Sequence, residues 1–232
     1  MVKMIHERLE SQILAAAEEL KAGNIIFVHD SSSRENEVDM VASAYMCTPE
    51  MISTMRERAG GLICSAIGNE VAANIHLPFM HEILELSHEK YPDLTSMIET
   101  RTPYGGRPAF SISVNHRDVF TGVSDGERCM TIRQIGNVAK LAAEGRDANS
   151  EFYSKLKSPG HVPLLIEARN SLAERRGHTE LSIRLARIAG LPPATVVCEM
   201  LDSRTHKSLD LEKARRIAGE LKLPIIEGEM LQ

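Results

Sequence analysis

The sequence has no tryptophan, and aromatic residues make up only 4% of its 232 residues. It contains no long apolar run, so we expect neither a membrane span nor the apolar centre of a signal peptide. It also lacks an excess of positive charge. The formal net charge of -5 argues against a surface that follows nucleic acid or anionic membrane. These absences predict a cytoplasmic protein whose partners are small molecules, not nucleic acid or a membrane.

Closely spaced cysteines are missing as well. The four cysteines are Cys47, Cys64, Cys129 and Cys198, and none forms a C-x-x-C motif. This spacing argues against a zinc knuckle and against a thioredoxin-like redox site. We expect reduced thiols, and we interpret Cys64 as a buried thiol without a catalytic role.

Apolar residues (43%) and charged residues (25%) are present in ordinary shares, enough to fold without disulfides. Hydrophobic periods and capping signals predict helices at residues 4–20, 49–59, 124–143, 178–189 and 211–221, and strands at residues 25–28, 38–44, 62–67, 110–114, 162–166 and 194–198. Residues 77–104 show no sustained period. No linker or repeat divides the chain, so we predict a single α+β domain over residues 1–232, with helices packed on a mixed sheet.

An acidic segment at residues 34–39 precedes the second expected strand. If it is extended, the period of two places Glu35, Glu37 and Asp39 on one face, about 7 Å apart. Carboxylates this close repel one another unless water or a cation compensates them, and their oxygens suit magnesium or manganese. The alternative is a solvated acidic loop, the commoner outcome for one short acidic run.

A second cluster opens the expected helix at residues 178–189. Its members are Arg175, Arg176, Gly177, His178 and Thr179. Unpaired N–H groups and the dipole at a helix start favour an anion, so this pattern predicts a phosphate site, although His178 can instead bind a metal. The alternative is a capped surface helix with Arg184 and Arg187 as solvated partners.

Two further residues are candidates for proton transfer. His161 ends the sequence Ser-Pro-Gly-His, which we interpret as a turn at residues 158–161. Glu199 follows the apolar strand at residues 194–198, and strand ends are common functional positions. Either side chain can move protons near neutral pH, although each alone is more often structural.

Taken together and in order, these segments resemble the family of 3,4-dihydroxy-2-butanone 4-phosphate synthases, enzymes of riboflavin biosynthesis that act on ribulose 5-phosphate. The resemblance rests on residues 34–39, 77–80, 121–124 with Arg128, 159–162, 175–180 and 198–199. It covers most of the chain between residues 25 and 199.

The resemblance implies a set of site residues. Magnesium or manganese would be held by Glu35 and His178. The implied substrate contacts are Arg34, Glu35, Asp39, Thr121, Arg175, Arg176, Gly177, His178, Thr179 and Glu199. The implied catalytic residues are His161, Glu199, Asp39 and Glu37. The family works as a homodimer with its site near the subunit boundary, and its α+β fold is similar to that of YrdC-type proteins.

The family reaction removes a proton from C3 to give an enediol, expels water, rearranges the carbon skeleton and releases C4 as formate. The other product is L-3,4-dihydroxy-2-butanone 4-phosphate. A different metal-dependent sugar-phosphate isomerase or aldolase would use the same residue types without releasing formate. A YrdC-like nucleotide- or RNA-binding module would need a basic groove, which the acidic composition argues against.

The sequence departs from the bacterial family pattern at three places. Val38 and Arg176 stand where glycine is usual, and residues 82–97 are longer than in short bacterial forms. These differences are similar to archaeal variation, and Arg176 leaves open which arginine contacts phosphate. No cysteine-rich zinc domain follows, so we expect a monofunctional enzyme.

Overall fold

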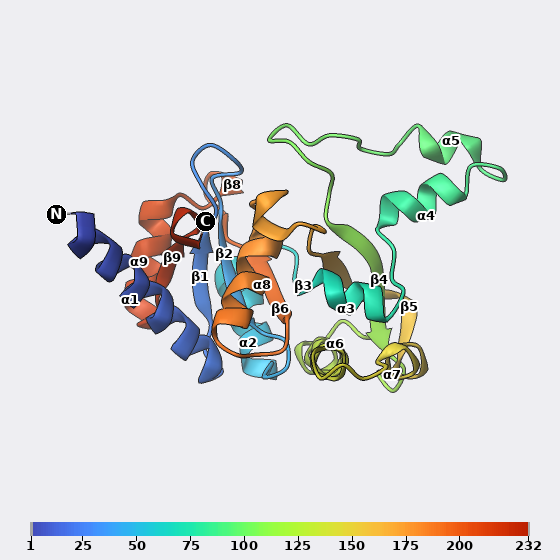
Figure 1. The fold of residues 1–232 in the computed structure, drawn as a ribbon, viewed down its shortest axis with the longest axis horizontal. Helices are drawn as coiled ribbons and strands as arrows, with labels where there is room; N and C mark the ends of the chain where they lie inside the picture. The colour runs from blue at the N-terminus through green and yellow to red at the C-terminus, as the bar shows by residue number, and fades with distance from the viewer. Residues whose placement is uncertain (1, 232) are drawn as a thin grey trace.

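The computed structural model describes residues 2–231, so the ends of the predicted domain, residues 1 and 232, lie outside it. Its centre is a seven-stranded mixed sheet in the order β4–β5–β3–β6–β2–β1–β9 (Figure 1). Pairs β1–β9 and β3–β5 are parallel, and the other pairs are antiparallel. The strands are β1 Ile26–His29, β2 Val38–Ser43, β3 Cys64–Ile67, β4 Phe110–His116, β5 Leu156–Ile166, β6 Ala194–Glu199 and β9 Ile225–Glu227.

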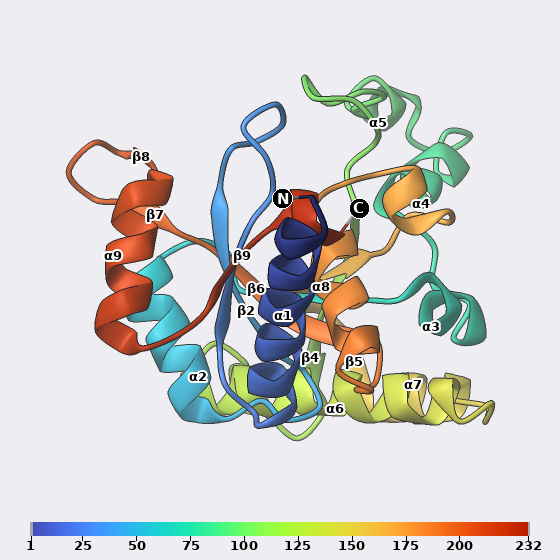
Figure 2. The ribbon, with the colours of Figure 1, turned by 60° about the vertical axis from the view of Figure 1, so that its left-hand side comes forward.

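Helices cover both faces of this sheet. Alternation along β2 sends Met40 into one apolar core and Val41 into the other. The helices α1 Val2–Lys21 and α8 His178–Ile188 pack on the Val41 face, and α2 Pro49–Thr54, α6 Asp125–Ala143 and α9 Leu211–Leu221 pack on the Met40 face (Figure 2). The predicted α+β fold with helices on a mixed sheet is confirmed. Within residues 2–231, no helix combines the length and apolar character that crossing a bilayer requires.

The expected helix at residues 49–59 begins and ends as its sequence indicates. The Thr48 hydroxyl accepts the N–H of Met51 at 3.3 Å, which satisfies one unpaired donor at the helix start. After α2 the backbone continues as a π-helical segment, η1 Met55–Ala59. Gly60 then ends it with a left-handed φ of 84°, which glycine adopts without a steric penalty.

Helix α6 starts where predicted, but its first turn differs from a capping box. The Ser124 hydroxyl accepts the N–H of Glu127, as expected. The Glu127 carboxylate, however, accepts the N–H groups of Phe120 and Gly122 at 2.7 and 3.0 Å. These bonds fold residues 120–124 onto the helix start. Burial alone would raise the pKa of Glu127, but this set of donors outweighs it and lowers the pKa to about 2.

The expected turn at residues 158–161 takes the form of a bulge inside strand β5, which runs from Leu156 to Ile166. Lys157 pairs with Asn115 and Val162 with Val114, so the four residues between them bulge out of the β4–β5 ladder. Residues 77–104, which show no sustained period, contain α4 Met80–Leu86 and α5 Pro92–Thr95 and project from the body of the molecule (Figure 1). The other unpredicted elements are short, which leaves little periodicity to detect: α3 Asn69–Asn74, α7 Asn149–Lys155, β7 Leu201–Asp202, β8 Lys207–Ser208, β9 Ile225–Glu227, η2 Ser171–Ala173 and η3 Gly228–Leu231.

All four cysteines are buried thiols. Burial, with the nearby carboxylates of Glu199 and Asp39, raises the pKa of Cys64 far above its ordinary value. A thiol that stays protonated is a poor nucleophile. The interpretation of Cys64 as a buried thiol is confirmed.

Candidate active site

The candidate site lies at one end of the sheet, beneath the start of α8. Asp39 at the beginning of β2 pairs with Glu199 at the end of β6. Alternation turns both side chains toward the face that α8 covers, the same face as Val41. A cavity of about 280 Å³ opens there, and it is lined by Glu35, Glu37, Asp39, Thr102, Tyr104, Pro108, Ala109, Phe110, Leu165, Arg175, His178, Thr179, Val197 and Glu199.

Asp30, which the sequence analysis did not select, shapes the acidic segment. Its carboxylate accepts the N–H groups of Glu35 and Glu37 at 3.0 and 3.1 Å. Asn36 takes a positive φ of 55°, so the segment bends back toward Asp30. Residues 35–37 are therefore not extended, and β2 begins at Val38, where the expected strand at residues 38–44 also begins. The loop nevertheless brings Glu35, Glu37 and Asp39 to one cavity.

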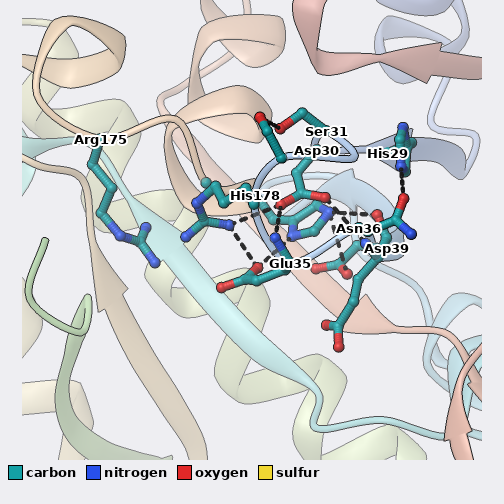
Figure 3. Close-up of polar contacts among 12 residues, drawn as sticks. His29, Asp30, Ser31, Glu35, Asn36, Asp39, Arg175 and His178 are labelled. Carbon is teal, nitrogen blue, oxygen red and sulfur yellow. Dashed lines mark hydrogen bonds and ion pairs between the residues drawn. The ribbon is translucent and has the colours of Figure 1, made fainter. Parts of the chain in front are cut away.

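His178 lies among these acids (Figure 3). Its Nδ1 is 3.4 Å from Glu35 Oε2, and its Nε2 is 3.6 Å from Asp39 Oδ1 and 3.2 Å from the carbonyl oxygen of Glu37. The imidazole comes from the first position of α8, whereas the acids come from the β1–β2 loop and from β2. Parts of the chain more than 130 residues apart thus meet at one point.

The local electrostatics shift the pKa values of Asp39, His178 and Glu35 in different directions. Burial favours the neutral form of Asp39 and, with the nearby carboxylates of Glu199, Glu35 and Glu37, leaves its pKa raised to about 7 despite His178. Burial alone would lower the pKa of His178, but the neighbouring Asp39 and Glu35 raise it to about 9. Burial also opposes ionisation of Glu35, but hydrogen bonds from His178 and Tyr104 and the charge of Arg34 lower its pKa to about 2. Such divergent values are typical of functional sites.

Three of these residues fit a metal ion. One ligand atom each from Asp30, Glu35 and His178 lies within 4.8 Å of the other two. Two carboxylates and one imidazole suit magnesium, manganese or zinc. The predicted ligands Glu35 and His178 are thus adjacent, and Asp30 joins them. The sequence held one signal for Asp30, its position directly after the first strand.

Arg34 lies at the edge of this cluster and is almost buried. Its Nη1 donates to Asp30 Oδ2 at 3.1 Å and lies 2.6 Å from Glu35 Oε2. Its Nη2 is buried and has no hydrogen-bond partner among residues 2–231. A buried donor without a partner is costly, and it marks a place where a ligand oxygen is expected.

Arg175 approaches the same place from the other side. Its Nη1 donates to the buried carboxylate of Glu180 at 2.7 Å, while its Nε is buried and unpartnered within the described chain. Gly177 leaves room for both guanidiniums, because a Cβ there would lie 2.7 Å from Arg34 Nη2 and 2.8 Å from Arg175 Nη1. Arg34 and Arg175 thus meet at the start of α8, where the sequence predicted an anion site with Arg175 and Arg176.

The structure separates the two adjacent arginines. Arg175 lines the cavity with His178 and Thr179. Arg176 is exposed and lines a neighbouring polar hollow of about 540 Å³, which also contains Ser31, Ser33 and Arg34. Arg175 is therefore the better placed of the two for an anion held beside His178.

Glu199 and Glu37 are each held by one further contact. The N–H of Leu62 donates to Glu199 Oε2 at 2.8 Å, and a Cβ on Gly61 would clash with that carboxylate at 2.6 Å. The hydroxyl of Ser208, on the small β7–β8 hairpin, donates to Glu37 Oε1. Both residues line the cavity.

His161 and Thr121 lie elsewhere. Neither lines the cavity, and both side chains are exposed. Asn115 connects them, because its side-chain nitrogen lies 3.1 Å from His161 Nδ1 and 3.3 Å from the carbonyl oxygen of Thr121. Within residues 2–231 they form a second, separate group of predicted site residues.

Comparison with known proteins agrees with this geometry. The family model described as 3,4-dihydroxy-2-butanone 4-phosphate synthase matches residues 14–232. Relatives with that name from Archaeoglobus fulgidus and Methanothermobacter thermautotrophicus are 40% and 39% identical, over 94% and 100% of this chain and 93% and 95% of theirs. The chain belongs to the 3,4-dihydroxy-2-butanone 4-phosphate synthase family.

A solved structure of a 3,4-dihydroxy-2-butanone 4-phosphate synthase in complex with two magnesium ions is 26% identical, covers 94% of both chains and superposes with a TM-score of 0.75. The riboflavin biosynthesis protein RibBA of Bacillus subtilis is 33% identical over 187 residues, which are 81% of this chain and 40% of that protein. The predicted family, fold and lyase activity in riboflavin biosynthesis are confirmed. The isomerase, aldolase and YrdC-like alternatives are not favoured.

Proposed function

We propose that the cavity binds ribulose 5-phosphate and converts it to L-3,4-dihydroxy-2-butanone 4-phosphate and formate. One observation carries this proposal. The metal-ligand group Asp30–Glu35–His178 lies directly beside two guanidiniums that each have a buried, unpartnered N–H. A phosphorylated sugar needs both features, an anion site at one end and a hard cation near its hydroxyl and carbonyl oxygens.

The phosphate would bind to Arg175 and to the start of α8. Arg175 Nε has no other partner in the described chain, and the Thr179 hydroxyl is on the same cavity wall. Arg34 would contact the sugar between the phosphate and the metal. Contacts at both ends of the substrate fix the reacting carbon against the acids, which lowers the entropic part of the barrier.

Asp30, Glu35 and His178 would hold magnesium, and manganese suits the same ligands. When bound, the ion polarises neighbouring sugar oxygens and so acidifies the C–H between them. Asp39 would take the C3 proton. Two observations support this role: its Oδ1 is buried without a hydrogen-bond partner among the described residues, and its pKa is raised to about 7. Glu37 and Glu199, at the same cavity, would handle the later proton transfers.

His161 and Thr121 would act in the cavity of a second copy of the chain, which makes the working form a homodimer. Both residues are exposed and lie outside their own chain's cavity. Two large apolar side chains next to Thr121 in the chain are also exposed, Phe120 at 96% and Val123 at 54%. Exposed apolar groups of this kind mark an interaction surface.

The four buried thiols are consistent with the reducing cytoplasm.

A single assay tests the proposed reaction. The purified protein is incubated with ribulose 5-phosphate, with and without EDTA, and formate is quantified. We expect formate in equal amount to the four-carbon phosphate, loss of both with EDTA, and recovery with magnesium. Absence of metal-dependent formate would contradict the proposal, and pentose or triose phosphates without formate would indicate an isomerase or an aldolase.

A further inference from the structure

Tyr104 reaches the site from the projecting segment between α5 and β4. A tight turn at residues 102–106 presents it. The N–H of Thr102 donates to the carbonyl of Gly106 at 2.9 Å, and the Thr102 hydroxyl donates to the carbonyl of Gly105 at 2.7 Å. Both glycines have positive φ, 91° and 79°, which residues with a side chain rarely adopt. The turn is thus built to place one side chain, that of Tyr104, against the β1–β2 loop.

The Tyr104 ring covers the face of Arg34. The guanidinium carbon lies 4.4 Å from the ring centre, within the range of a cation–π contact. Asp30 and Glu35 hold the same guanidinium through its Nη1. The carboxylates and the ring together hold the guanidinium so that its buried Nη2 remains available to a ligand.

The Tyr104 hydroxyl bonds to Glu35. An ionised carboxylate can only accept, so the phenol O–H is the donor in this hydrogen bond. Glu35 therefore receives hydrogen bonds from Tyr104 and His178 on top of its ion pair with Arg34. Partners of this kind fix the orientation of a metal-binding carboxylate.

Tyr104 also stands between two hollows. It lines the cavity that contains His178 and the polar hollow that contains Arg176. Of the residues named so far, only Arg175 shares this position. Removal of the ring would join the two spaces beside the proposed phosphate site.

We propose that Tyr104 is a positioning residue with two separable parts: its hydroxyl orients Glu35 toward the metal, and its ring orients Arg34 toward the substrate and closes the cavity from the adjacent hollow. This inference rests on the proposed function, because it assigns Glu35 to the metal and Arg34 to the substrate. Loss of the hydroxyl should weaken metal binding, and loss of the ring should raise KM.

Two substitutions separate the parts. Tyr104→Phe removes the hydroxyl and keeps the ring, and Tyr104→Leu removes both. The matched controls are Tyr91→Phe and Tyr91→Leu, since Tyr91 lies on the same projecting segment, is 52% exposed and contacts Lys90. Mn²⁺ binding is measured by electron paramagnetic resonance without substrate, and kcat and KM are measured from formate release. Thermal melts confirm that each variant is folded.

We expect Tyr104→Phe to weaken Mn²⁺ binding about tenfold with KM nearly unchanged. Tyr104→Leu should show the same Mn²⁺ loss and, in addition, a KM about tenfold higher. Both Tyr91 variants should stay within about twofold of the wild type, as expected for exposed positions. Wild-type Mn²⁺ affinity in Tyr104→Phe, wild-type KM in Tyr104→Leu, or equal losses in the Tyr91 variants would overturn the inference. If the wild type bound Mn²⁺ without forming formate, the proposed function would fail while the binding comparison still tested Tyr104.

Discussion

The two ends of helix α8 each carry a cluster of buried charge, and the clusters differ in how completely their groups are paired. At the C-terminal end, Glu167 is fully buried and accepts from Arg187 at 2.6 and 2.7 Å, from the Ser171 hydroxyl and from the N–H of Asn69. Arg187 in turn bonds to Glu70. At the N-terminal end, around His178, several buried polar atoms have no hydrogen-bond partner in the described chain.

This difference separates a structural cluster from a functional one. Charged groups that are paired with one another have no hydrogen-bonding capacity left for a ligand, and their role is structural. Buried polar groups beside a cavity that lack a protein partner gain one when a ligand binds. The pairing of Arg187 also bears on the alternative interpretation of α8 as a capped surface helix with solvated arginines. Arg187 is not a solvated side chain, because it neutralises a buried carboxylate.

The largest expected effect is at the N-terminal cluster. His178→Ala should lower formate formation about 1000-fold or more, because several kcal/mol of metal-derived stabilisation is lost at about 1.4 kcal/mol per factor of ten. Formate assays with circular dichroism melts check this. Turnover near the wild-type rate in a folded variant would remove His178 from the metal site.

The next effect concerns stability at the C-terminal cluster. Arg187→Ala should lower the free energy of unfolding by about 2 kcal/mol, since it leaves Glu167 buried and unpaired; this is below the usual cost of breaking a buried pair because Arg187 is partly exposed. Urea denaturation measures the loss. The kcat of the folded fraction should be unchanged, and a large fall in kcat would show that the two clusters are coupled.

The pH dependence of stability should reflect the same cluster. Burial opposes ionisation of Glu167, but hydrogen bonds from Arg187 and Ser171 outweigh it and leave its pKa lowered in the folded state. A lowered pKa contributes stability above the unfolded value of about 4.3, and this contribution is lost as the pH falls through the folded value. In Glu167→Gln, the unfolding free energy should therefore fall less steeply below about pH 5 than in the wild type. Parallel curves would contradict the assignment.

The smallest effect is expected at the edge of the active-site cavity. Ser208→Ala removes the donor to Glu37 and should lower kcat about three- to tenfold, the equivalent of one hydrogen bond. Ser208→Thr should restore most of the rate. Ser203→Ala, an exposed change on the same hairpin, is the control. Equal rates in both alanine variants would show that the Ser208 hydroxyl does not position Glu37.

Much of the fold followed from local patterns. The long elements, such as α6 and α8, carry enough turns for their apolar period and their caps to be recognised. Short elements such as α3 and α7 were missed because they span less than about two turns. The start of β5 at Leu156 was missed because a Pro-Gly pair indicates a turn, whereas residues 158–161 form a bulge and the strand pairs with β4 on both sides of it.

For the site, the sequence by itself determined the candidate side chains. Arg175, Arg176, the acids of residues 34–39 and His178 were all selected from their residue types and spacing. Only the tertiary structure decided their neighbours. It added Asp30 and Tyr104, favoured Arg175 over Arg176 and set His161 and Thr121 apart. The physical reason is that residue type and local period act within a few turns of chain, whereas ion pairs, burial and unpaired donors depend on which distant segments the sheet brings into contact.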